Sequence, residues 1–275
     1  MKTGFIGLGV QGKGLAMNAV AAGFEVAVYD LHPAPCAELA ACGATVVRSS
    51  ADVARGSRIV QVCVLNDEQL EAVISGPDGL LSAAAPGTII AVHSTVRPAT
   101  VLALAEEGRA RDIHVIDAPV SGGAAGAQAK RMSFMVGGPE AIVEVCRPLF
   151  EASGSRITHT GALGSGLRAK LAHQMIISIN LLAAYEGMKL GVAAGLSEEM
   201  LEQVVRDGAA QSFVANHWSS LGLGPHAPAV FYKDLQLCIE LAHSLGFGVP
   251  GAALAQQMID VILADHRFLT GQKPS

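Results

Sequence analysis

The sequence is poor in aromatic residues and in charge, and each shortage narrows the class of protein. Aromatic residues make up 4% of the 275 positions and charged residues 16%, whereas 51% are hydrophobic. This composition is typical of a globular protein and excludes an intrinsically disordered one. The net charge of −5 leaves no basic excess, which argues against nucleic acid and anionic membranes as partners.

Cysteine is also scarce, and no apolar run is long. The five cysteines form no C-x-x-C pair and lie at Cys36, Cys42, Cys63, Cys146 and Cys238. Unpaired thiols of this kind are typical of a reducing compartment. The apolar runs fall short of the roughly 20 residues of a membrane span. A strand expected within the first three residues leaves no room for a signal peptide. We therefore expect a cytoplasmic protein.

The first thirty residues contain a glycine-rich turn between a strand and a helix. We expect a strand over Thr3–Ile6, a helix from Gly12 to about Ala22 and a second strand over Phe24–Tyr29. The turn reads Gly7-Leu8-Gly9-Val10-Gln11-Gly12, and Asp30 follows eighteen residues after the last glycine. In this G-x-G-x-x-G pattern the glycines permit a tight turn, close approach to a pyrophosphate and helix–strand packing. The pattern predicts a dinucleotide site.

Asp30 also bears on which dinucleotide binds. A carboxylate at this position accepts hydrogen bonds from the adenosine ribose and repels a 2′-phosphate. The next residues, Leu31, His32 and Pro33, include no arginine that could receive that phosphate. The sequence therefore favours NAD over NADP.

Strands and helices continue to alternate up to about residue 160. Expected helices are Ala34–Cys42, Glu68–Ile74 and Glu140–Ala152; expected strands are Ile59–Leu65, Ile89–Val92, His114–Ile116, Met132–Val136 and Arg156–Thr160. This alternation predicts an α/β domain over residues 1–160 with a doubly wound parallel sheet.

Ligands of such sheets bind beyond the carboxyl ends of the strands. The candidate residues there are Leu65 and Asn66, then Ser94 and Thr95, then Ser121, Gly122 and Gly123. Ser94 or Thr95 could instead cap the following helix. The serine and the two glycines could cradle a carboxylate, or could form only a turn.

Residues 161–275 are expected to form an all-helical domain that opens with a long helix. Between Gly161 and Gly195 the pattern predicts about thirty helical residues, roughly 45 Å in length. Nearly every face is apolar, so we expect burial. Further helices are expected at about Glu198–Asp207, Gln211–Ser219, Ala229–Ser244 and Ala252–His266.

Two features of the long helix suggest function. Lys170 shares a face with His173 and Gln174, and it either snorkels to the surface or is buried with a partner. Gly187, Gly191 and Gly195 recur every four residues. They favour close approach of another helix, from the same domain or from a second subunit, and we expect a homodimer or homotetramer.

Four motifs together resemble the β-hydroxyacid dehydrogenase family, which is related to 6-phosphogluconate dehydrogenase. They are GFIGLGVQGKGLAMNAVAAGFEVAVYD, DAPVSGGAAGAQAKRMSFMVGG, GALGSGLRAKLAHQ and FYKDLQL, in that order along nearly the whole chain. The resemblance implies a catalytic lysine at Lys170 and a carboxylate site at Ser121, Gly122 and Gly123. It also implies a substrate-binding amide at Gln174, and at Lys233 a second lysine near the cofactor.

The sequence departs from the family pattern at three places. One is His93, which replaces a residue that is often acidic. His173 stands where the family often has asparagine, and it is similar to the phosphogluconate branch. Lys130 and Arg131 replace the usual Gly-Thr of the second motif. These departures affect the substrate more than the reaction.

The resemblance implies an NAD-dependent oxidoreductase acting on a small, carboxylate-bearing β-hydroxyacid such as 3-hydroxyisobutyrate. Lys170 would be the general base, acting in its neutral form, and no metal is expected. Three alternatives remain open: a decarboxylating sugar-acid dehydrogenase, an imine reductase-like enzyme, and a non-catalytic NAD-binding module.

Overall fold

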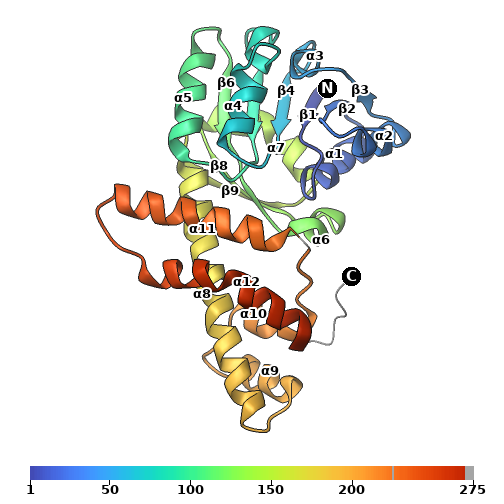
Figure 1. Cartoon of the computed structure of the whole chain (residues 1–275). Coiled ribbons are helices and arrows are strands. Elements are labelled where there is room, and N and C mark those ends of the chain that lie inside the picture. The colour runs from blue at the N-terminus through green and yellow to red at the C-terminus, as the bar shows by residue number, and fades with distance from the viewer. Residues whose placement is uncertain (225, 270–275) are drawn as a thin grey trace. The chain divides into compact units, whose positions relative to one another are not determined.

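A nine-stranded sheet forms the centre of the first unit, Met1–Lys170 (Figure 1). The computed structural model describes residues 1–224 and 226–269. The strands are β1 Lys2–Ile6, β2 Glu25–Tyr29, β3 Thr45–Val46, β4 Ile59–Val62, β5 Ile89–Val92, β6 His114–Asp117, β7 Val120–Ser121, β8 Ser133–Gly137 and β9 Arg156–Gly161. Their order is β3-β2-β1-β4-β5-β6-β8-β7, with β9 paired to β8.

The expected parallel sheet is present from β3 to β6, and β9 is parallel to β8. The edge differs, because β8 runs antiparallel to both β6 and β7. The chain enters β7 three residues after β6 and returns through a six-residue helix, which is too short for the usual parallel crossover.

Helices cover both faces of this sheet, as a doubly wound fold requires. They are α1 Gly12–Ala21, α2 Pro33–Ala41, α3 Ser50–Ala54, α4 Asp67–Ser75, α5 Pro98–Arg109, α6 Gly123–Gln128 and α7 Glu140–Glu151, with a 3₁₀ turn at Leu80–Ser82. Apolar side chains of α1, α2, α6 and α7 form one core cluster, and those of α3, α4 and α5 form another on the opposite face (Figure 1).

The second unit, from Leu171 onward, is helical. It comprises most of α8 Ser165–Ala193, then α9 Glu198–Asp207, α10 Phe213–Asn216, a 3₁₀ turn at Trp218–Ser220, α11 Ala227–Ser244 and α12 Pro250–Leu269. Its core surrounds the fully buried Trp218. The division between the units falls inside α8, whereas the sequence assigned the whole long helix to the second domain.

One expected helix of this unit is shorter than its sequence pattern suggests. The helix expected over 211–219 is only α10, which Ser212 caps by accepting the Ala215 N–H. The chain then turns at Trp218–Ser220. The buried carboxylate of Glu202, on α9, accepts the Ser219 N–H and so holds this turn.

The expectation that α8 is buried on nearly every face is wrong for the single chain. Ile176 is 62% exposed and Leu190 is 73% exposed. By length and composition α8 could cross a membrane, a property that core helices of soluble proteins share. Its buried polar residues Lys170, Gln174 and Ser178 are instead typical of a helix inside a protein.

The glycines of α8 and its end have different structural reasons. A Cβ at Gly191 would lie 2.5 Å from Leu201 of α9, so one helix of the same unit approaches closely there. Gly195 has a φ of +92° and ends the helix. Gly187 has no atom within 4 Å of its Cβ position. Close approach within the domain therefore accounts for Gly191 alone.

Candidate functional site

The glycine-rich turn joins β1 to α1 with little space for side chains. Gly7 has a φ of +87°, and a Cβ there would lie 2.3 Å from the carbonyl oxygen of Cys63. A Cβ at Gly12 would lie 2.0 Å from the Gly7 carbonyl. By contrast, a Cβ at Gly9 would meet no atom of the described residues within 4 Å. The turn thus packs tightly on the sheet side and is open at Gly9, where a phosphate could approach the backbone.

A cavity of about 550 Å³ lies beside this turn. Of the predicted cofactor residues, Gly7, Gly9, Asp30 and Leu65 line it. One carboxylate oxygen of Asp30 accepts the Leu8 N–H at 2.6 Å and the other accepts the His32 N–H at 2.8 Å. The carboxylate is therefore fixed at the cavity wall, so the residues present fit a dinucleotide with its ribose at Asp30.

Arg48 also lines this cavity, and sequence reasoning missed it. The three residues directly after Asp30 contain no arginine, so the local sequence around Asp30 does not point to Arg48. Arg48 follows β3, the strand that pairs with β2. The pairing of these two strands is the signal that could have found it.

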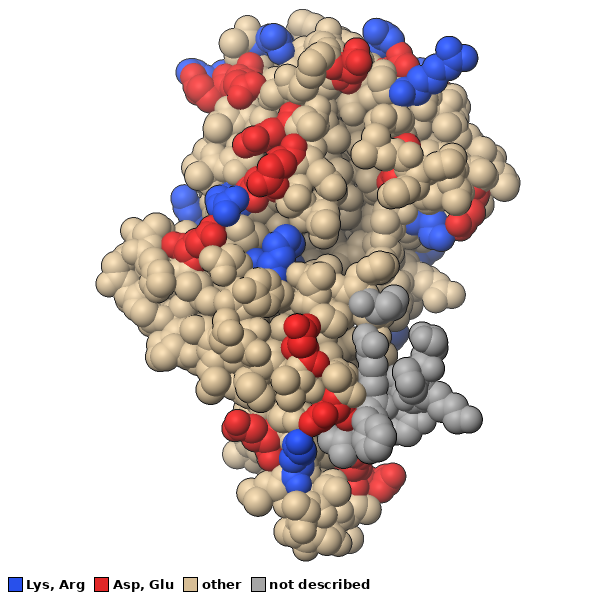
Figure 2. Space-filling view, in the orientation of Figure 1, with Lys and Arg blue, Asp and Glu red and all other residues tan. Residues whose placement is uncertain are grey.

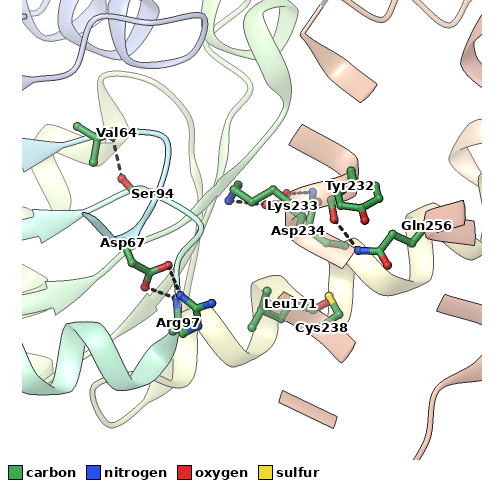
Figure 3. A network of polar contacts seen from close by, with 11 residues as sticks. Val64, Asp67, Ser94, Arg97, Leu171, Tyr232, Lys233, Asp234, Cys238 and Gln256 are labelled. Carbon is green, nitrogen blue, oxygen red and sulfur yellow. Dashed lines mark hydrogen bonds and ion pairs between the residues drawn. The ribbon is translucent and has the colours of Figure 1, made fainter. Parts of the chain in front are cut away.

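Two of the predicted polar residues support the cavity wall. Ser94 Oγ accepts the Val64 N–H at 2.8 Å (Figure 3). Asn66 Oδ1 accepts the Gln69 N–H at 2.9 Å and so caps α4. The alternative that Ser94 caps the following helix is wrong, because α5 begins after Arg97 without a side-chain cap. Thr95 is half-buried beside Ser94.

The remaining residues of the turn lie at the start of α1. Val10 is 61% exposed, and Gln11 precedes the helix without a side-chain hydrogen bond to it. The first turn of α1 contains no acidic residue. The amino end of α1 therefore carries the partial positive charge of a helix start, which favours an anion near the open Gly9.

The segment Ser121-Gly122-Gly123 turns sharply after β7. Ser121 pairs with Ser133 of β8, which fixes the start of the turn. Gly122 and Gly123 have φ values of +138° and +60°, so the backbone adopts a conformation that favours glycine. A Cβ at Gly123 would meet no atom within 4 Å. This part of the backbone is therefore open to a small ligand.

His93 links three neighbouring strands of the sheet. Its Nδ1 lies 2.7 Å from the carbonyl oxygen of Ala118, just after β6, and its Nε2 lies 2.9 Å from the side chain of Gln61 on β4. The imidazole is 2% exposed, and burial lowers the pKa of His93 to about 4. A neutral ring donates from Nδ1 to the Ala118 carbonyl.

Lys170 lies one turn into a helix whose start is fixed by a buried carboxylate. Asp117, at the end of β6, accepts the N–H groups of Gly164 and Leu167, both at 2.7 Å. Burial raises the pKa of Asp117, and the backbone donors oppose that rise. Lys170 itself is 6% exposed. The alternative that Lys170 snorkels to the surface is therefore wrong.

His173, Gln174 and Lys233 belong to the second unit, where Asp234 connects two of them. Gln174 Nε2 donates to one oxygen of Asp234 at 2.6 Å. Lys233 forms an ion pair with the other oxygen at 2.8 Å (Figure 3). Asp234 is 2% exposed, so this carboxylate has two close polar partners in a buried setting. His173 Nδ1 lies 3.3 Å from the Gln174 side-chain oxygen.

Comparison with known proteins agrees with this geometry. Residues 2–161 match the model of the NAD binding domain of 6-phosphogluconate dehydrogenase. Residues 164–268 match the model described as NAD-binding of NADP-dependent 3-hydroxyisobutyrate dehydrogenase.

Individual relatives extend over nearly the full chain. An NAD-dependent L-serine dehydrogenase of Pseudomonas aeruginosa is 34% identical, over 98% of this chain and 96% of its own. A 2-hydroxy-3-oxopropionate reductase of Escherichia coli is 33% identical, over 96% and 92%. A solved 3-hydroxyisobutyrate dehydrogenase of Mycobacterium tuberculosis with L-serine has a TM-score of 0.85 at 28% identity, covering 96% of this chain and 94% of its own.

The fold and the dinucleotide cavity define the class of protein, an oxidoreductase that depends on NAD or NADP. Within that class, the chain belongs to the β-hydroxyacid dehydrogenase family, as the full-length relatives show.

Proposed function

We propose that this protein interconverts a small β-hydroxyacid of the 3-hydroxyisobutyrate type and its semialdehyde, with Lys170 as the general acid/base. The observation that carries the proposal is the burial of Lys170, 6% exposed, directly after a helix start held by Asp117. A buried lysine on a helix fixed in this way is expensive to keep unless it has a role.

The chain's own residues divide the remaining tasks. Ser121 and the backbone of Gly122 and Gly123 bind the substrate carboxylate. Gln174 and His173, one turn after Lys170, bind a substrate oxygen, and Lys233 contributes to the cofactor site. A bound nicotinamide supplies the hydride acceptor in oxidation. Lys170 Nζ takes the hydroxyl proton in that direction and returns it in reduction.

We further propose that NAD is preferred to NADP. Asp30 supports this, because its carboxylate lines the cavity, and a carboxylate at this place in the fold binds the ribose and repels a 2′-phosphate. We expect kcat/KM with NAD to exceed that with NADP by at least about tenfold, since a charge clash costs several kcal/mol. Steady-state rates with both cofactors measure this ratio, and equal or better use of NADP would contradict it.

The proposal extends to the organisation of the protein. Residues 1–160 form the NAD-binding domain, and residues 161–275 carry substrate residues and the surface for assembly. We propose a cytoplasmic homodimer or homotetramer. Exposed apolar side chains on the helices of the second unit, among them Leu190 and Ile176, support assembly.

The test is the Lys170→Met variant, assayed with a panel of β-hydroxyacids. General acid–base catalysis contributes about 10²–10⁴-fold, so kcat should fall by at least the lower figure. Affinity for NAD, measured by calorimetry, should be unchanged. Lys170→Arg should not restore activity, because arginine does not lose its proton near neutral pH. The pH profile of wild-type kcat for oxidation should show a limb from one group that must be deprotonated for activity.

Retention of more than about a tenth of wild-type kcat in Lys170→Met, with that pH limb intact, would move the base to another residue. Lys233 would be the next candidate. Absence of any turnover by the wild type, with NAD still bound, would favour a non-catalytic binding module.

A further inference from the structure

Arg48 and Asp30 occupy equivalent positions just beyond the carboxyl ends of two paired strands. Strands β2 and β3 are parallel, with Val28 paired to Val46, and the Val47 N–H donates to the Val28 carbonyl. Asp30 comes two residues after Val28, and Arg48 comes two residues after Val46. Parallel strands present equivalent positions at the same edge of a sheet. The two side chains therefore leave neighbouring strand ends.

Both residues line the same cavity, together with His32. Arg48 is exposed, and within residues 1–224 and 226–269 no carboxylate pairs with it. Several other arginines do pair with acidic side chains, namely Arg55, Arg97, Arg109, Arg147 and Arg206. The Arg48 guanidinium is thus available to an anion that enters the cavity.

The chemistry of the cavity wall identifies that anion. The Leu8 and His32 N–H groups hold Asp30 at the cavity wall. A carboxylate at this position of a dinucleotide-binding fold binds the ribose 2′-oxygen. A phosphate on that oxygen would be repelled by Asp30. A guanidinium can bind the same phosphate through two hydrogen bonds.

We propose that Arg48 forms a 2′-phosphate subsite in this cavity, through which the protein also binds NADP. The subsite rests on the dinucleotide-binding part of the proposed function and is independent of Lys170. The Asp30 carboxylate makes the affinity for NAD higher than that for NADP, and Arg48 reduces this difference by binding the 2′-phosphate. Removing Arg48 should therefore increase the ratio of the two affinities, and removing the Asp30 charge should decrease it.

The experiment uses two cofactor fragments that require no catalysis, 2′,5′-ADP and 5′-ADP, titrated calorimetrically into the full chain. Arg48→Gln should weaken 2′,5′-ADP by at least about tenfold, the scale of a charge-assisted hydrogen-bond pair, and change 5′-ADP by less than about threefold. Arg58→Gln is the matched control. It removes the same charge next to the amino end of β4, whereas the cavity lies at the carboxyl ends of the strands. It should change neither affinity.

A second variant tests the opposition of the two charges. Asp30→Asn should increase the affinity for 2′,5′-ADP, and adding Arg48→Gln should remove that increase. Three results would each overturn the subsite. They are an equal loss of affinity for both fragments in Arg48→Gln, an unchanged affinity for 2′,5′-ADP in that variant, and no binding of 2′,5′-ADP to the wild type. Failure of 5′-ADP to bind the wild type would overturn the dinucleotide cavity as well, whereas an inactive enzyme that binds both fragments would contradict only the proposed reaction.

Discussion

At the scale of single residues, His93 shows how a buried side chain can hold in place the segment that we propose binds the substrate carboxylate. It connects Gln61 on β4 with the carbonyl of Ala118, three residues before Ser121. Its ring contacts Phe5, Phe134 and Phe150 at centroid distances of 5.6 to 6.2 Å. This apolar setting favours the neutral imidazole.

The stability of the protein should consequently depend on His93 between pH 6.5 and 4. Burial lowers the pKa of His93 from 6.5 to about 4 in the folded state. Over that range the unfolded chain binds a proton at this residue and the folded chain does not, so stability falls as pH falls. The shift corresponds to about 3 kcal/mol. Urea unfolding of wild type and His93→Gln at pH 7 and pH 4.5 measures it.

The difference between the two proteins should shrink by about 2 to 3 kcal/mol at the lower pH. Leu39→Ala is the control, because it disturbs the same core cluster on α2 and is not among the ring partners of His93. Its difference from wild type should stay constant with pH. A His93→Gln difference that is also constant would show that the imidazole does not titrate in this way.

At the scale of elements, α8 depends on a glycine at its start and tolerates side chains further along. A Cβ at Gly166 would lie 2.3 Å from the Met135 carbonyl oxygen. The Gly164 and Leu167 N–H groups, which donate to the Asp117 carboxylate, lie on either side of Gly166 in the chain. Gly187, in the same helix, has open space at its Cβ position. The two glycines therefore have opposite consequences for substitution.

Gly166→Ala should destabilise the protein by about 1–3 kcal/mol, because backbone atoms have to move. It should also lower kcat, since Lys170 lies one turn later. Gly187→Ala should leave kcat unchanged and stabilise the monomer by up to about 1 kcal/mol, because alanine is the better helix former. Chemical denaturation and steady-state assays of both variants check this. Equal stability of the two variants would contradict the close contact at Gly166.

At the scale of the whole molecule, charge is sparse and apolar surface is concentrated on the helical unit. Acidic and basic side chains are interspersed on the face in Figure 2, and most of that surface carries neither charge. Exposed apolar side chains of the second unit include Ile176, Leu190, Val204, Phe213 and Leu254. Each is at least 53% exposed. Exposed apolar surface gathered on one part of a protein is typical of an interaction site.

We predict a dimer or tetramer by light scattering at micromolar concentration. Leu190→Glu should shift the population toward the monomer, because burying a charge in an apolar interface costs the desolvation of that charge. Leu102→Glu, on an exposed position of α5 in the first unit, should leave the assembly unchanged. A wild type that stays strictly monomeric would contradict the intersubunit interpretation of α8.

Local pattern was enough to predict much of this protein. The β1–α1–β2 unit, the bounds of α9 and the strand β5 follow from periodicity, capping and glycine placement, which involve residues within one element. Asp30 was found because its spacing from the glycines is fixed by one helix. Lys170 stood out as a lysine in an apolar helix, but two physical explanations were open for it, and its catalytic role is a prediction from the resemblance.

Contacts between distant segments were decided only by the tertiary structure. Strand pairing brings Arg48 to the wall that Asp30 forms, His93 joins two strands on either side of its own, and Asp117 caps a helix that starts nearly fifty residues later. None of these follows from periodicity. Register and strand order set which side chains meet, and they result from packing of the whole sheet, whose free energy no single segment encodes.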